Sequence, residues 1–200
     1  RDDQQGSFLA RFAKEALQLN KVAIIYEEDN YGKGLKNSFV SEAEKLGLEI
    51  VATETYQRGR TQDFRPHMTK IKNAGADGIF ISGLFNEAAL ILKTAKDDLG
   101  MDVPFFGGDG LSSDDLIATG GEAADGIYVT TPFLFGEKID TPAATKFRDD
   151  FQAMHGKAPD TWAALTYDAI SQLLDVVQQT GTDRAAIRGA LAETTSKEAG

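Results

Sequence analysis

The stretch Lys21-Val22-Ala23-Ile24-Ile25-Tyr26 is short, apolar and rich in β-branched side chains. Runs of this kind form strands that are buried on both faces of a parallel sheet. Apolar residues recur at helical spacing before it, from Phe8 to Leu19, and after it, from Lys33 to Leu46. The stretch therefore predicts a buried strand between two amphipathic helices.

The same unit recurs along the first two thirds of the chain. We expect further strands over 49–56, 77–82, 103–106 and 126–131, and helices over about 63–73, 86–98 and 112–118. Strands that alternate with helices of this length indicate βαβ units, parallel pairing and right-handed crossovers. The predicted fold class is α/β, with a parallel sheet and helices on both of its faces.

The pattern changes after Pro132. The sequence from Ala143 to Thr180 is almost wholly helical in pattern, with no strand in it, and a short helix over 183–192 is expected to follow. Proline and glycine residues at 132, 136 and 142 mark a boundary at about 131–140. We therefore expect residues 1–131 to form an α/β domain and residues 132–200 to be a helical segment that belongs to another sheet.

Composition excludes several classes of protein. The chain has 200 residues, 21 Lys and Arg against 31 Asp and Glu, a net charge of −10 and no cysteine. No apolar run approaches the ~18–20 residues that cross a bilayer. The acidic balance and the scattered cations speak against nucleic-acid binding. Disulfides and cysteine-ligated metals are excluded, and the opening residues lack an initiator Met and the pattern of a signal peptide, so we expect a mature product or a fragment.

Three loops follow predicted strands and contain the candidate binding residues. Tyr31 lies in the loop after the first strand, Leu84 and Phe85 follow the strand at 77–82, and Asp109 follows the strand at 103–106. Ligands of open parallel sheets bind outside the carboxyl ends of the strands. We therefore expect Tyr31, Leu84 or Phe85, and Asp109 to face a common cleft.

Each of these signals also has a purely structural interpretation. Gly-Gly-Asp-Gly at 107–110 is typical of a turn that tolerates positive φ, and Tyr31 is explained equally well as a ring packed over a loop. The acidic residues 27–29 are expected to be a solvated face. His67 and His155 are expected to be surface residues.

Catalytic, cofactor and metal chemistry have little support. The sequence has no phosphate-binding loop, no complete dinucleotide fingerprint, and no aspartate at Ile81-Ser82-Gly83 where a phosphoacceptor site needs one. A Gly-x-Ser-x-Gly elbow and a histidine and carboxylate cluster with metal-ligand spacing are also missing. We expect no catalytic residue, no cofactor and no metal site, and thus a protein that is not an enzyme.

A series of short motifs in order along nearly the whole chain resembles the branched-chain amino-acid-binding (Leu/Ile/Val-type) periplasmic proteins. These are the solute receptors of ABC importers. The motifs are Asp2-x-x-Gln5-Gly6, Lys21–Tyr26, Asn30-Tyr31-Gly32-x-Gly34-Leu35, Gly59-x-Thr61-x-Asp63-Phe64, Gly75–Phe80, Gly107–Gly110, Gly120-x-x-Ala123-x-x-Gly126-Ile127-Tyr128, and Thr161–Ala164 followed by Tyr167-Asp168-Ala169.

The resemblance implies a type I periplasmic binding protein fold, a two-lobed clamshell of which this sequence is the second half. Residues 1–131 would be the second lobe, and residues 132–200 would return to the first lobe. In family members that bind amino acids, the positions of Asp2, Tyr31 and Asp109 meet the ligand's ammonium group. Some relatives have a tyrosine where this chain has Leu84-Phe85, which leaves a more apolar wall and an open side-chain specificity.

The resemblance also implies a function and partners. The expected protein is a periplasmic receptor that binds an amino acid or a similar small zwitterion and delivers it to an ABC permease in the membrane, without a cofactor. The missing first lobe, or another chain, would cover the apolar faces of residues 143–180. The alternative is a ligand-sensing regulatory module or receptor ectodomain of the same fold.

Overall fold

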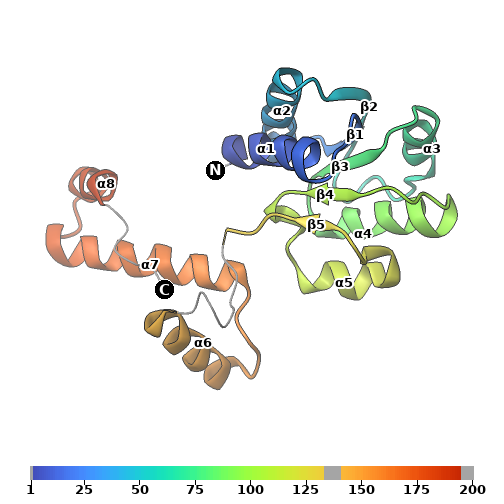
Figure 1. Ribbon diagram of the computed structural model, residues 1–200. Coiled ribbons are helices and arrows are strands. Elements are labelled where there is room, and N and C mark those ends of the chain that lie inside the picture. Colours follow the sequence, from blue (N-terminus) through green and yellow to red (C-terminus); the bar gives the residue numbers. More distant parts are fainter. Residues whose placement is uncertain (1, 133–140, 195–200) are drawn as a thin grey trace. The chain divides into compact units, whose positions relative to one another are not determined.

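The computed structural model of the protein describes residues 2–132 and 141–194. The chain divides into two compact units, Arg1–Thr131 and Pro132–Gly200, and each is described by itself. Figure 1 shows the first unit as a sheet with helices on both faces, and the second as a set of helices.

Among the described residues of the first unit, five parallel strands form a sheet in the order β2-β1-β3-β4-β5 (Figure 1). The strands are β1 (Lys21–Glu27), β2 (Glu49–Tyr56), β3 (Gly78–Ser82), β4 (Phe105–Gly107) and β5 (Tyr128–Val129). The α-helices are α1 (Asp2–Arg11), α2 (Asn30–Lys45), α3 (Arg65–Asn73), α4 (Phe85–Lys93) and α5 (Asp114–Gly120). Two π-helical turns extend α1 and α4, at Phe12–Ala16 and Thr94–Asp98, and 3₁₀ turns lie at Asp109–Leu111 and Gly121–Ala124.

The predicted α/β class is confirmed. The largest difference between a predicted and an observed strand length is at β5, which forms one lateral edge of the sheet. The strand expected at 126–131 has only two residues. It pairs with β4 through Phe106–Tyr128 and Gly107–Val129. β4 itself has only three residues, so a neighbouring strand can pair with it over only a short length.

The sheet is buried on both faces, as its apolar strands predict. Alternate residues of β1 point to opposite sides: Val22 and Ile24 join a core with α1 and α2, and Ala23 and Ile25 join a core with α3, α4 and α5. On the first side three aromatic rings contact one another: Phe80 lies 4.4 Å from Phe39 and 5.6 Å from Phe106, and Phe39 lies 5.9 Å from Phe106. This aromatic cluster ties α2 to the two strands that carry the loops at 83–86 and 107–110.

The second unit is helical over its described residues, 141–194, and no strand is present there. It contains α6 (Pro142–His155), α7 (Thr161–Thr180) and α8 (Arg184–Glu193). The helical pattern predicted from 143 to 180 is broken at Gly156, whose φ of 71° ends α6. Thr141, Asp160 and Asp183 each cap the helix that follows through a side-chain oxygen.

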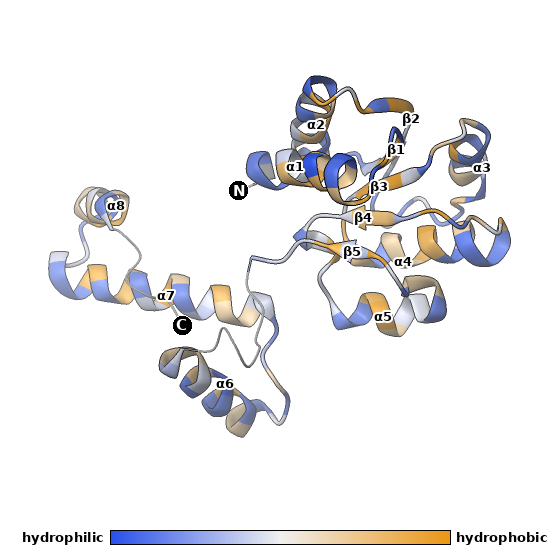
Figure 2. Ribbon diagram, viewed as in Figure 1, coloured by the Kyte–Doolittle hydropathy of each residue, from blue (hydrophilic) through white to orange (hydrophobic). Residues whose placement is uncertain are grey.

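One face of α7 is apolar and open to solvent within its own unit. Trp162, Tyr167, Ile170 and Leu174 are each about half exposed. Figure 2 shows hydrophobic positions, in orange, recurring along α7. In the described part of the chain, no helix combines the length with the hydropathy that a membrane span requires.

Phe80→Ala is expected to lower the free energy of unfolding by about 3–5 kcal/mol, because it removes a fully buried ring that contacts both Phe39 and Phe106 and leaves a cavity. Chemical denaturation followed by circular dichroism measures the change. Ile117→Ala is the control: its side chain is 64% exposed on α5, and the expected change is within about 0.5 kcal/mol. Similar losses in both variants would contradict the assigned core.

Candidate functional site

The loops after β1 and β4 meet at the carboxyl edge of the sheet through Tyr31. Its hydroxyl donates to Oδ1 of Asp109 over 3.0 Å and accepts the backbone N–H of Gly110 over 3.1 Å. Tyr31 lies in the first turn of α2, and Asp109 follows β4. Two residues 78 positions apart in the sequence are thus joined, and both are partly buried.

A third segment reaches the same place from α1. Oε1 of Gln5 accepts the backbone N–H of Asp109 over 3.3 Å and the hydroxyl of Thr130 over 3.4 Å. Gly6 permits the approach of α1 to α2, because a Cβ there would lie 2.7 Å from the backbone oxygen of Leu35. In the sequence Gln5 stands out only as part of the motif Asp2-x-x-Gln5-Gly6, which gives no sign of this contact.

The glycines of the loop at 107–110 are required by close packing. None of Gly107, Gly108 and Gly110 has a positive φ, so the explanation by turn geometry is wrong. A Cβ on Gly108 would lie 2.9 Å from the hydroxyl of Tyr31, and a Cβ on Gly110 would lie 2.7 Å from the backbone oxygen of Gly83. The loop is therefore pressed against the ends of its neighbours.

The other residues singled out from the sequence occupy different places. Leu84 precedes α4 and lies beside the Tyr31 site, since a Cβ on Gly110 would meet its Cδ2 at 2.9 Å and Cε1 of Tyr31 at 3.0 Å. Phe85 is half-buried and packs against the core formed with α3, α4 and α5. Asp2 begins α1, but its side chain lies outside the described residues.

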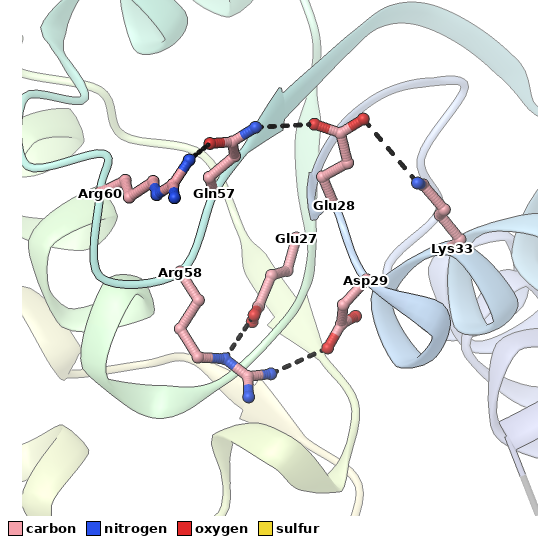
Figure 3. A pocket seen from close by; sticks show the side chains of 7 residues that line it. All are labelled: Glu27, Glu28, Asp29, Lys33, Gln57, Arg58 and Arg60. Atoms are coloured by element: carbon pink, nitrogen blue, oxygen red, sulfur yellow. Dashed lines mark hydrogen bonds and ion pairs between the residues drawn. The ribbon is translucent and has the colours of Figure 1, made fainter.

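A hollow of about 520 Å³ lies at the same edge beside the ends of β1 and β2. Figure 3 shows the side chains that line it: Glu27, Glu28, Asp29, Lys33, Gln57, Arg58 and Arg60. Arg58 forms an ion pair with Glu27 through Nε and a second one with Oδ2 of Asp29 through Nη2, over 2.9 Å (Figure 3). The lining is therefore charged, with most charges paired across it.

Glu27 contradicts the expected solvated face at 27–29. It is only 2% exposed, because it continues the buried strand β1 and its charge is met by Arg58. Burial raises the pKa of its carboxyl above the ordinary 4.5, and the hydrogen bond and charge of Arg58 offset part of this effect. Burial also raises the pKa of the nearby Tyr56 hydroxyl, and the negative charges of Glu27 and Glu87 raise this pKa further.

His67 also departs from the sequence prediction. Its ring is half-buried, 5.9 Å from that of Phe64, and its Nδ1 atom is buried. His155 is exposed as expected. The part of the chain that the structure describes has no group of three or more His, Cys, Asp or Glu side chains arranged to hold a metal ion.

Comparison with known proteins assigns the chain to a family. A family model described as periplasmic binding protein matches residues 1–199. The chain belongs to the periplasmic binding protein family. It is 25% identical over 180 residues to a leucine-, isoleucine-, valine-, threonine- and alanine-binding protein of Pseudomonas aeruginosa, covering 90% of this chain and 47% of that protein. It is 30% identical over 195 residues to a Leu/Ile/Val-binding protein homolog of Brucella melitensis, covering 96% and 51%.

Solved structures of this periplasmic binding protein family share the fold. The branched-chain amino acid transporter substrate binding protein LivJ of Streptococcus pneumoniae, in complex with isoleucine, superposes with a TM-score of 0.87 at 30% identity. The match covers 99% of this chain and 56% of that one. The chain thus has the type I periplasmic binding protein fold, and it spans about half the length of the curated relatives it matches.

The raised pKa of Glu27 predicts a pH-dependent stability. Relative to a chain that lacks this titration, stability is greatest below about pH 4.5 and falls as the pH rises through the raised value, because the folded state holds the proton more tightly than the unfolded chain. The free energy of unfolding of the wild type minus that of Glu27→Gln, measured by denaturation at a series of pH values, is expected to decrease and then level off. A difference that grows with pH would show that Arg58 lowers the pKa of Glu27 by more than burial raises it.

Proposed function

We propose that the parent of this chain is the periplasmic receptor of an ABC importer, and that it binds an amino acid or a similar small zwitterion. The observation that carries the proposal is the hydrogen bond between Tyr31 and Asp109 at the carboxyl edge of the sheet. Membership of the periplasmic binding protein family and the names of the relatives support it.

The chemistry of this pair suits an α-ammonium group. A carboxylate forms strong charge-assisted hydrogen bonds with an ammonium, and a tyrosine adds its hydroxyl or ring face beside it. Asp109 is oriented by three contacts: Tyr31 binds its side chain, Gln5 binds its backbone, and the glycines on either side pack closely. In the proposal Asp2 adds a second acid, and Leu84 and Phe85 give an apolar wall for the ligand's side chain.

The same proposal assigns the two units to two lobes. Residues 1–131 would be the second lobe, and residues 132–200 would return to the first lobe. The exposed apolar face of α7 supports this assignment, because an apolar helix face of this kind needs a surface to cover it. The first lobe, or another chain, would then bury residues 143–180.

The receptor's own step in transport is then binding and closure, without a reaction. Closing two lobes around the ligand would present a composite surface to the membrane permease, and this surface would exist only in the loaded receptor. The site would work outside the cytoplasm, in the periplasm. The receptor itself needs no cofactor and no catalytic residue for this step.

Titration calorimetry on the full-length parent with a panel of amino acids tests the proposal. We expect at least one amino acid with a free ammonium group to bind, and its N-acetylated derivative to fail because it lacks the charge that Asp109 meets. Binding of a sugar or an aromatic acid, with no binding by any amino acid, would overturn the proposed ligand class.

Asp109→Asn in the same parent is expected to weaken binding of that amino acid by about 1–3 kcal/mol, because a charged hydrogen bond becomes a neutral one. Calorimetry measures the loss. Asp102→Asn is the matched control, since Asp102 is exposed and lies just before β4, at the opposite end of that strand from Asp109. Equal affinities for Asp109→Asn and the wild type would remove Asp109 from the site.

A further inference from the structure

Arg58 joins the loop after β2 to the loop after β1. Its Nε pairs with Glu27, the last residue of β1, and its Nη2 donates to Oδ2 of Asp29 over 2.9 Å (Figure 3). The Arg58 side chain is half exposed, so these two ion pairs, rather than packing, hold the guanidinium in place. A planar guanidinium fixes the direction of two carboxylates at once.

Asp29 connects this ion pair to the start of α2. Its other oxygen, Oδ1, accepts the backbone N–H of Gly32 over 2.7 Å and so caps the helix. Tyr31 lies between the two residues that form the cap. The Asp29 carboxylate therefore connects Arg58 to the first turn of α2, which carries Tyr31.

The two segments that Arg58 joins each have one further contact with the rest of the fold. A Cβ on Gly32 would lie 2.3 Å from the backbone oxygen of Glu27, so the turn is packed directly against the end of β1. The loop that carries Arg58 is anchored on α4, because the N–H of Gly59 donates to Oε1 of the buried Glu87 over 2.9 Å. Arg58 thus links the first turn of α2 to an anchored loop.

We propose that Arg58 is a positioning residue that acts through Asp29 to hold Tyr31 toward Asp109, and thereby raises the affinity of the site for its ligand. The inference rests on the proposed function in that Tyr31 contacts the ligand. Arg58 itself lines the charged hollow and reaches the Tyr31 site through Asp29. A role limited to neutralising Glu27 is the competing explanation, and it predicts an effect that does not depend on Tyr31.

A double-mutant cycle in the full-length parent separates these explanations. The variants are Arg58→Met, Tyr31→Phe and the two combined, and the probe is the amino acid that binds the wild type most tightly in the calorimetric panel. We expect Arg58→Met to weaken binding about tenfold in the wild type and less than twofold in the Tyr31→Phe background. Equal losses in the two backgrounds would overturn the proposal.

Two further variants control for charge and location. Arg58→Lys keeps the positive charge but not the planar guanidinium that reaches two carboxylates at once. Its affinity is expected to lie between those of Arg58→Met and the wild type. Arg60→Met removes a cation from the same loop. Among the described contacts, the Arg60 side chain donates only a long hydrogen bond of 3.5 Å to Oε1 of Gln57, and we expect affinity to be unchanged. A tenfold loss in Arg60→Met would show that the overall charge of the loop, and not Arg58, matters.

Amide hydrogen exchange tests the positioning without any ligand. Arg58→Met is expected to speed exchange about tenfold or more at the amides of Gly32 and Gly110, which donate to Asp29 and to Tyr31, with little change in β3. Unchanged protection of both amides would refute the proposal. If the wild type binds no amino acid, the proposed function fails, and the exchange measurement still decides whether Arg58 positions Tyr31.

Discussion

The parallel pairing of β1 with a strand on each side is the constraint on which the rest of the first unit depends. β1 pairs with β2 on one side and β3 on the other, and both of its faces are buried. Because all partners run in the same direction, every strand delivers its following loop to the same edge. The Tyr31 and Asp109 site and the hollow beside Arg58 are consequences of that shared direction.

The fold could be predicted from the sequence because its signals are local and repeated. Strands with continuous apolar runs alternate with helices of period 3.6, and this pattern alone determines a parallel sheet with two covered faces. The length of β5 could not be predicted, since it depends on how far β4 extends beside it. The break in the predicted helix after 143 shows how a glycine with positive φ ends a helix that apolar spacing would continue.

The site was predictable in part. Strand ends indicated that the loops of Tyr31 and Asp109 would meet, but spacing gave no sign that Gln5 would bind the backbone of Asp109 from α1. The burial of Glu27 was missed for a similar reason. Its partner, Arg58, lies 31 positions away on the next strand's loop, and a local pattern of three acids cannot reveal a neutralising charge at that distance in sequence.

The two edges of the sheet are protected from intermolecular strand pairing in different ways. An unpaired edge is a template for aggregation, and long apolar edges are the most hazardous. β5 ends after two residues, so it exposes too few backbone groups to recruit another strand. β2 is longer, but it carries polar and charged residues such as Glu49, Thr53 and Glu54, the last paired with Lys70. Neither lateral edge of the sheet therefore offers another chain a long apolar strand to pair with.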